Sequence, residues 1–345
     1  MTTPHALLIG RTIGAVVHQH RNDVHEAGGI IRRFDVYGTV LATAFPFATP
    51  GPETNARAAV RFTCAEVPTP YALDPGCLVD AQGRRDDGEA DFAFYRLPGF
   101  DAVRITGATD FLVADDHIEC RLVDPAHRYL VEIALMGMVF ALWLERRGLP
   151  TLHASAATVD GRAVGFLGSR GGGKTSLAAG CLNAGHALLA DDLLAIRWTD
   201  GTAYGQRGWP ALRLWPDQLR HFVGAVPDLP VVHPDHHKRR MHIGDGFGRF
   251  AHSATPLVRL YLPERTVADG GRVSIQRLDG RHAVMALLRH SFLPREVERF
   301  GLQPERLRQF ARLVAGVPVA VLRYPSGFDR LTDVVAAIEA DLAEQ

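Results

Sequence analysis

Eight consecutive residues fit the phosphate-binding pattern G-x-x-x-x-G-K-[ST]. Glycines let successive backbone N–H groups turn inward around phosphate oxygens, and the helix expected from about Gly173 adds the positive end of its dipole. Lys174 would contact the β- and γ-phosphates of ATP, and the Thr175 hydroxyl would bind Mg²⁺, which prefers hard oxygen ligands. A glycine-rich turn before an ordinary helix is the alternative, and the strand-like run Ala163 to Leu167 ahead of the loop disfavours it. The predicted nucleotide-binding residues are Gly168, Ser169, Arg170, Gly171, Gly172, Gly173, Lys174, Thr175 and Ser176.

Two adjacent carboxylates, Asp191 and Asp192, follow a short apolar run at Ala187 to Ala190. A carboxylate at the tip of a buried strand beside a phosphate loop is placed to bind the Mg²⁺ ion that bridges the β- and γ-phosphates. Neighbouring residues of a strand point to opposite faces, so one carboxylate is expected to bind the metal while the other meets the nucleophile. The pair could instead begin a turn, but a turn does not need apolar residues on both sides, and Leu193 to Ile196 follow.

A histidine precedes the loop on an alternating strand. His153 lies in the run Leu152 to Ala156, and the chain then turns at Asp160-Gly161, a two-residue hairpin signal, into the strand that feeds the loop. This hairpin would put His153 on the neighbouring strand, within reach of the carboxylates. A lone histidine on a strand is more often a hydrogen-bonded core residue, so the residue type alone does not decide its role.

The segment from Leu152 to Arg197 resembles the C-terminal catalytic domain of HPr serine kinase/phosphorylase and its relatives of unassigned substrate. That family shows an H-x-S-A element, a short hairpin, the phosphate loop, a helix and then G-H-x-L-[IVL]-x-D-D. The resemblance implies an α/β fold with a P-loop kinase domain, and ATP and Mg²⁺ as cofactors. It implies that one carboxylate binds the metal while the other, paired with the histidine, removes the proton from a serine hydroxyl. We carry these roles to Asp191 as metal ligand and to Asp192 as base, with His153 assisting. The matching residues are His153 to Ala156, Lys174-Thr175 and Gly185 to Asp192.

The stretch after the acid pair departs from the bifunctional HPr enzymes. Those enzymes carry a glutamate and an R-G-x-G run there, whereas Gly208 to Asp217 reads GWPALRLWPD and contains no glutamate. The pattern L-[RK]-L-W-P-D, with Lys238-Arg239-Arg240 and Arg289-His290, is similar to HPr-kinase-related proteins found among peptide-tailoring enzymes, including the lasso-peptide kinases. This second resemblance spans Phe34 to the C-terminus and implies an acceptor other than HPr. The bifunctional relatives form hexamers, so the resemblance leaves open that this chain forms a homo-oligomer.

Among 38 lysine and arginine residues the chain has only two lysines, Lys174 and Lys238. A compact ammonium is suited to phosphate, so the second lysine is also a candidate for the site. It lies in the basic stretch His236 to Arg240, which would close over the γ-phosphate or recruit an acidic peptide; a solvated loop is the alternative. We rank Lys238 before Arg213 and Arg289 as the additional cation of the transfer. Four nearby histidines match no standard metal-ligand spacing; they are His233, His236, His237 and His242.

Composition limits the partners and the compartment. The formal net charge is +0, so the chain carries no general electrostatic footprint for nucleic acid or an anionic membrane. The N-terminus shows no export signal, and a cytoplasmic protein is therefore predicted. The most apolar segment, Ile133 to Leu144, is too short to span a bilayer and is predicted to form a buried helix. The cysteines are scattered without pairing signatures, as is typical of reduced thiols in the cytosol; they are Cys64, Cys77, Cys120 and Cys181.

At 345 residues the chain is long enough for two domains. We predict a mobile extension at residues 1–30, a β-rich domain at 31–125, a linking helix at 126–150 and a P-loop kinase domain at 151–345. The linking helix is expected at Tyr129 to Arg147, and a long surface loop at Pro68 to Gly99. Further expected elements are strands at Val36 to Thr43, Ala58 to Cys64 and Phe111 to Ala114, and helices at Ala283 to Arg289 and Asp329 to Leu342.

We therefore predict an ATP-dependent kinase that transfers the γ-phosphate to a hydroxyl, with serine of a peptide or small protein as the acceptor. Two alternatives stay open. A small-molecule hydroxyl kinase would share every phosphate-handling residue. A non-catalytic ATP-binding regulatory module would more often lose the acid pair or the histidine. The residues predicted to carry catalysis are Lys174, Asp192, His153 and Lys238, and those predicted to bind the metal are Thr175 and Asp191.

Overall fold

The computed structural model describes residues 29–169, 171–244, 247–266 and 271–344. The extension expected at residues 1–30 lies, except for its last two residues, outside this part of the chain, and so does Arg170. Contacts divide the chain into two compact units. The first holds Leu41–Pro46 and Ala56–Val131 with the described residues before Phe34; the second holds Phe34–Val40, Phe47–Asn55 and the residues from Glu132 onward.

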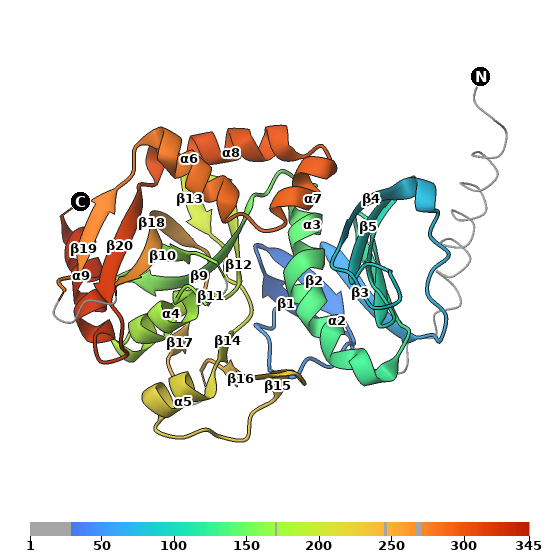
Figure 1. The fold of residues 1–345 in the computed structure, drawn as a ribbon, viewed down its shortest axis with the longest axis horizontal. Helices are drawn as coiled ribbons and strands as arrows, with labels where there is room; N and C mark the ends of the chain where they lie inside the picture. Colours follow the sequence, from blue (N-terminus) through green and yellow to red (C-terminus); the bar gives the residue numbers. More distant parts are fainter. Residues whose placement is uncertain (1–28, 170, 245–246, 267–270, 345) are drawn as a thin grey trace. The chain divides into compact units, whose positions relative to one another are not determined.

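The first unit is built on strands in the order β3-β8-β7-β6-β5-β4, with the end of β2 paired to β3 (Figure 1). Strands β2, β3 and β8 are parallel, and β8 to β4 run antiparallel to one another. Its inward face is aromatic, because Phe62, Phe94 and Phe111 are buried. The strands are β1 (Arg32–Val36), β2 (Thr39–Thr43), β3 (Val60–Glu66), β4 (Leu78–Gln82), β5 (Phe92–Leu97), β6 (Phe100–Ile105), β7 (Thr109–Val113) and β8 (His117–Leu122).

Two predictions for this part of the chain are wrong. Val36 to Thr43 is not one strand, because Tyr37 and Gly38 have positive φ angles of 54° and 73° and turn the chain between β1 and β2. Pro68 to Gly99 is not one long loop, because it contains a short 3-10 helix (Pro75–Cys77) and strands β4 and β5. Strand β4 was obscured by a buried aspartate, Asp80, at a position where alternation favours an apolar residue. The strands expected near Ala58 to Cys64 and Phe111 to Ala114 are confirmed as β3 and β7.

The cysteines are less scattered in space than along the chain. Cys64 of β3 lies opposite Cys120 of β8, with the two Sγ atoms 3.5 Å apart. Both are free thiols in this structure. The sequence could not show this neighbourhood, because it depends on the parallel pairing of strands that are far apart in the chain.

The second unit is built on a nine-stranded sheet in the order β17-β11-β9-β12-β13-β18-β20-β19, in which β10 pairs with both β9 and β18. A separate sheet has the order β14-β16-β15. The mixed α/β class is confirmed. The strands are β9 (Thr151–Val159), β10 (Arg162–Leu167), β11 (Ala187–Ala190), β12 (Leu193–Thr199), β13 (Thr202–Gly205), β14 (Ala211–Leu214), β15 (Val231–His233), β16 (His236–His242), β17 (Arg249–Phe250), β18 (Thr255–Thr266), β19 (Ser274–Arg277) and β20 (Val319–Pro325).

Helices cover both faces of the nine-stranded sheet (Figure 1). Alternate residues of β10 enter two different apolar clusters, because successive side chains of a strand point to opposite faces. Val164 and Phe166 pack with α4 (Lys174–Asn183) and α9 (Leu331–Ala343). Ala163 and Leu167 pack with α6 (Gly280–Arg289) and α8 (Gln303–Gly316). The two predicted late helices are thus confirmed as α6 and α9, whereas α7 (Pro294–Arg299) and α8 were not predicted.

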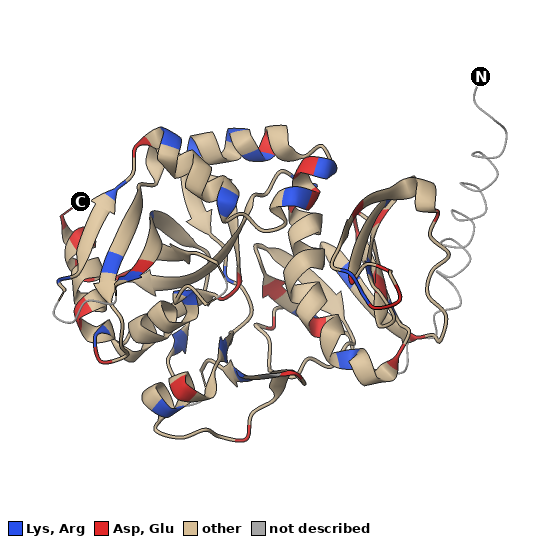
Figure 2. Ribbon diagram, viewed as in Figure 1, with Lys and Arg blue, Asp and Glu red and all other residues tan. Residues whose placement is uncertain are grey.

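The predicted linking helix is a longer and less regular segment than expected. It comprises η2 (Pro125–His127), α2 (Arg128–Ala134), a π-helical segment η3 (Leu135–Val139) and α3 (Phe140–Glu145), with a kink at Gly137. By length and composition alone, Pro125–Glu145 could cross a membrane, but 67% of its most apolar window is buried within the structure. A buried core helix of this kind passes the same test, so the helix is weak evidence for a membrane span. Lysines and arginines are interspersed with acidic residues along the elements of both units (Figure 2).

Candidate active site

The glycine-rich loop joins β10 to the first turn of α4. Gly171 and Gly173 have positive φ angles of 80° and 90°, which favour glycine. A Cβ atom at Gly173 would also lie 2.8 Å from the hydroxyl of Tyr324, closer than side chains tolerate. The Lys174 Nζ donates hydrogen bonds to the carbonyls of Gly168 (2.6 Å) and Ser169 (3.1 Å). Backbone N–H groups at a helix N-terminus and a lysine ammonium therefore converge at one place, as phosphate binding requires.

The acid pair occupies an interruption in a strand. Strands β11 and β12 both pair with β9, and Asp191 and Asp192 fall between them; the register with β9 shifts just before, between Leu188 and Ala190. Asp192 has a φ of 72°, in the left-handed region that aspartate tolerates better than most residues. The prediction of opposite faces is therefore wrong: the alternation of a regular strand does not apply, and both residues line the same cavity. A strained backbone at such a point is typical of functional sites.

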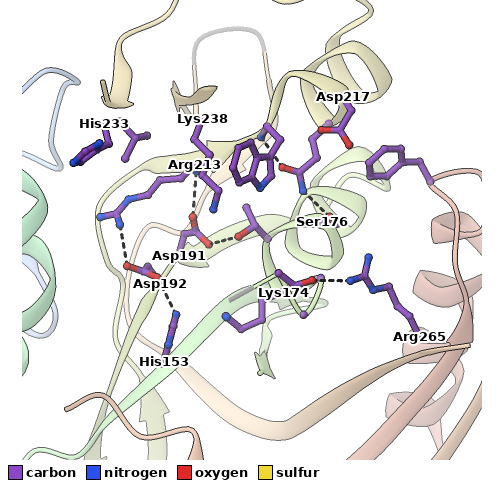
Figure 3. Close-up of a pocket in the computed structure, with 18 of the residues that line it drawn as sticks. His153, Lys174, Ser176, Asp191, Asp192, Arg213, Asp217, His233, Lys238 and Arg265 are labelled. Atoms are coloured by element: carbon purple, nitrogen blue, oxygen red, sulfur yellow. Dashed lines mark hydrogen bonds and ion pairs between the residues drawn. The ribbon is translucent and has the colours of Figure 1, made fainter. Parts of the chain in front are cut away.

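Different side chains contact the two carboxylates, although the Arg213 backbone N–H also donates to Asp191 Oδ2 at 3.2 Å (Figure 3). Asp191 accepts hydrogen bonds from the hydroxyls of Ser155 (2.6 Å) and Thr175 (3.1 Å) through Oδ1. Asp192 Oδ1 lies 3.1 Å from His153 Nε2, and its Oδ2 accepts a 2.9 Å hydrogen bond from Arg213. Asp191 thus faces the loop, and Asp192 faces a histidine and an arginine.

Burial and charge together shift the pKa values of these groups. Burial alone would raise the pKa of Asp192, but the Arg213 guanidinium, followed by the hydrogen bond and charge of His153, holds that pKa well below its usual range. Burial lowers the pKa of the Lys174 ammonium, although Asp192 and Asp191 act in the opposite direction. For Arg213, the same two carboxylates outweigh the effect of burial and raise the pKa.

His153 is held in place by a segment far from it along the chain. Its backbone N–H donates to the carbonyl of His290 (2.8 Å), and its ring lies 5.6 Å from the ring of Phe292. That segment is anchored by Arg306, whose fully buried guanidinium pairs with Glu145 at 2.8 Å and donates to the carbonyl of Phe292 at 2.6 Å. The histidine predicted from a strand pattern is therefore fixed by residues up to 153 positions away.

A further group of side chains comes from β14 and α5 (Pro216–Val223). Trp215 lies under the Lys238 ammonium, 5.3 Å from the ring centroid. Gln218 accepts a hydrogen bond from the Trp215 backbone N–H (2.7 Å) and donates one to the hydroxyl of Ser176 (2.6 Å). Ser176, which we expected among the nucleotide contacts, therefore also joins the loop helix to the segment that carries Trp215.

These residues surround one cavity of about 500 Å³. Sequence reasoning found the loop, the acid pair, His153 and Lys238, and the cavity brings them together, although Gly168 and Ser169 do not line it. Arg289 does not line it either. The sequence analysis missed four cavity residues and named Arg213 only as a candidate additional cation; the missed residues are Trp215, Gln218, Arg265 and Phe328. The alternation of arginine and tryptophan in L-R-L-W could have indicated that these two side chains share the face of the cavity.

The oxygen donors beside the loop suit Mg²⁺. The Thr175 hydroxyl and the Asp191 carboxylate are 3.1 Å apart, and Mg²⁺ is commonly held by one or two protein oxygens together with substrate phosphates and waters. In the described part of the chain, no group of three or more histidine, cysteine or acidic side chains could hold a metal ion by itself.

Comparisons with known proteins include a remote structural likeness. No protein-family model matches the chain, and no curated protein matches it. Among solved structures, the chain is similar to the Hpr(Ser) kinase/phosphatase from Coxiella burnetii, with 11% sequence identity and a TM-score of 0.33. The match covers 56% of this chain and 90% of the other. At this distance the likeness carries no argument about activity, so function must be argued from the site.

Proposed function

We propose that the protein is an ATP-dependent kinase that transfers the γ-phosphate to a hydroxyl group, with serine of a peptide or small protein as the acceptor. One observation carries the proposal: Asp191 and Asp192 share a cavity with the loop lysine but have separate partners, Thr175 for the first and His153 for the second. A protein that only bound ATP would need the loop and a metal ligand. It would not need a second carboxylate paired with a histidine.

The proposed reaction depends on positioning and on charge. The loop N–H groups and Lys174 bind the β- and γ-phosphates. Thr175 and Asp191 would hold Mg²⁺, which would supply positive charge to the phosphate oxygens. His153 orients Asp192, and Asp192 accepts a hydrogen bond from the attacking hydroxyl. Lys238 lines the same cavity and supplies a second ammonium for the transferred group.

The nature of the acceptor rests on the sequence resemblance to peptide-tailoring kinases. The proposal also includes a cytoplasmic location, no nucleic acid or membrane as partner, and a homo-oligomeric assembly. These parts rest on the sequence. Neutral net charge supports the exclusion of nucleic acid.

The decisive experiment is to incubate the purified protein with Mg²⁺, γ-labelled ATP and host extract separated by size. Label on a peptide or protein supports the proposal and identifies the acceptor fraction. Label confined to small metabolites would replace it with a small-molecule kinase. No transfer despite tight ATP binding would indicate a regulatory module.

A matched variant separates binding from transfer. Asp192→Asn keeps the shape of the side chain and removes its charge, so we expect transfer to be lost while the Kd for ATP changes by less than about threefold. Normal transfer by Asp192→Asn would show that the role given to this carboxylate is wrong.

A further inference from the structure

Two cysteines of the first unit are neighbours in space although 56 positions separate them in the chain. Cys64 of β3 and Cys120 of β8 are register partners in a parallel pair of strands, and their Sγ atoms lie 3.5 Å apart. Neighbouring strands are about 4.8 Å apart, which falls within the range of Cα separations at which disulfides form. The two sulfur atoms can therefore be joined without separating the strands.

The departure of β2 from the sheet opens a path to Cys64. Among the described residues, β2 pairs with β3 only from Val60 to Phe62. The Thr43 hydroxyl then accepts a hydrogen bond from the backbone N–H of Phe45 (2.9 Å), and the chain turns away. Cys64 lies two residues beyond the last pair, is half-buried, and lines the cavity of about 510 Å³ beside this part of β3. A small solute in the cavity can therefore reach its sulfur.

Cys120 lies on the closed side of the pair. Strand β8 has β3 on one side and β7 on the other, and Cys120 is fully buried. Its Sγ lies 3.1 Å from the hydroxyl of Thr109 on β7. The two thiols thus have different surroundings: a solute meets Cys64 first, and Cys120 is in contact with Cys64.

The two thiols also differ in acidity. The hydrogen bond with Cys120, followed by the charge of Arg128, lowers the pKa of Cys64, although burial and Glu66 act in the opposite direction. Burial, followed by the contact with Cys64, raises the pKa of Cys120. Because the thiolate is the form that attacks oxidants, both accessibility and acidity favour Cys64 as the first thiol to react.

We propose that Cys64 and Cys120 form a modification site for hydroperoxides, at which Cys64 is oxidised and Cys120 then completes a reversible disulfide. With hydrogen peroxide, the Cys64 sulfur bonds to one oxygen, the O–O bond breaks, and the other oxygen leaves as hydroxide and takes up the thiol proton to form water. The Cys120 sulfur then attacks the Cys64 sulfenic acid, and the sulfenic hydroxyl leaves with the Cys120 proton as a second water. The two sulfurs together lose two electrons, which the peroxide gains, and an added dithiol reverses the step. The site does not depend on the proposed kinase function.

The test treats the reduced full-length protein with hydrogen peroxide and follows each cysteine by mass spectrometry of non-reduced peptides. We expect the protein to lose the mass of two hydrogen atoms, Cys64 and Cys120 to appear in one linked peptide pair, and dithiothreitol to reverse both changes. Cys77 is the internal control, because it is also half-buried but burial raises its pKa. It should be oxidised at least about tenfold more slowly than Cys64. Equal rates at Cys64 and Cys77, or oxidised Cys64 without a link to Cys120, would overturn the proposal.

Two matched variants separate the roles of the thiols. Cys120→Ser keeps a hydrogen-bond donor beside Cys64 but cannot form the disulfide, so we expect Cys64 to stop at the sulfenic acid, which a 1,3-dione reagent labels. In Cys64→Ser, Cys120 should be oxidised at least about tenfold more slowly than Cys64 is in the unchanged protein, because it is buried. Circular dichroism verifies that each variant is folded. A folded Cys120→Ser without label at Cys64, or rapid oxidation of Cys120 in Cys64→Ser, would contradict the proposed order of reaction.

Discussion

The two units each contain a large cavity, and the two cavities have nearly the same volume. The candidate active site measures about 500 Å³, and the cavity of the first unit, lined mainly by β3 and by the end of β2 with the residues after it, measures about 510 Å³. In the first unit, Arg128 pairs with Glu66 at 3.1 Å and lies over the ring of Phe45, so its charge is matched beside it. The cavity size alone therefore does not distinguish a site from a gap in the packing.

The difference lies in where the charges come from. In the second unit, charged or hydrogen-bonding groups from four elements line one cavity; the elements are β9, the interrupted strand, α4 and β14. The pKa of the Asp192 carboxyl among them is held below its usual range. Bringing buried charges together costs solvation energy, which a fold offsets only by dense pairing. Convergence of this kind is a better sign of function than volume, and the predictions below test it from the largest expected effect to the smallest.

The largest effect is expected from Lys174→Ala. Its ammonium is almost fully buried and bonded to the loop carbonyls, and we expect its removal to weaken ATP binding by about 100-fold and to abolish transfer. Isothermal titration with ATP and Mg²⁺ measures the loss. The matched control is Lys238→Ala, which removes the only other lysine and should leave the Kd for ATP within about threefold while lowering kcat. Equal losses of ATP affinity in the two variants would mean that the lysines share one role.

His153→Ala should have the next largest effect. Without the imidazole, Asp192 loses its contact at Oδ1 but keeps Arg213 at Oδ2, so we expect kcat to fall by about 30- to 100-fold with ATP binding preserved. His153→Gln, which can still donate a hydrogen bond, should be less impaired. A pre-steady-state measurement of phosphoryl transfer separates this step from product release. If His153→Ala and the unchanged protein transferred phosphate at the same rate, the histidine would be a core residue, as its type alone suggested.

Whether a site residue could be predicted from the sequence depends on how far apart along the chain the residues in contact lie. The loop, the acid pair and His153 were predictable because each belongs to a short motif. Arg213 was named only as a candidate cation; its contacts with the carboxylates were not predictable, because they depend on the strand interruption at Asp191-Asp192 and on the place of β14 in the fold. The same limit applies to the fold: α9 was predicted from its own apolar stripe, whereas β4 carries a buried aspartate that no local pattern explains.

Arg265→Ala should give a smaller change at the edge of the site. Its guanidinium donates to the carbonyl of Gly171 at 2.7 Å and is largely exposed, so the bond is worth about 1 kcal/mol at most. We expect the Kd for ATP to rise about three- to fivefold with little effect on kcat, because the contact shapes the loop and does not touch the acid pair. A matched measurement with ADP shows whether the γ-phosphate is involved. A loss as large as that of Lys174→Ala would mean that Arg265 itself binds phosphate.

The smallest effect is expected in the other cavity. Arg128→Gln and Glu66→Gln each break the ion pair that lines it, and we expect kcat and the Kd for ATP to change by less than about twofold, because surface pairs contribute at most about 1 kcal/mol to stability. The double variant, with the two amides hydrogen-bonded, serves as the control for misfolding. Phosphoryl transfer and ATP titration are measured as for the site variants. A tenfold loss of transfer with unchanged ATP affinity would contradict the view that only the second cavity takes part in the reaction. The ion pair of the first cavity would then contribute to transfer.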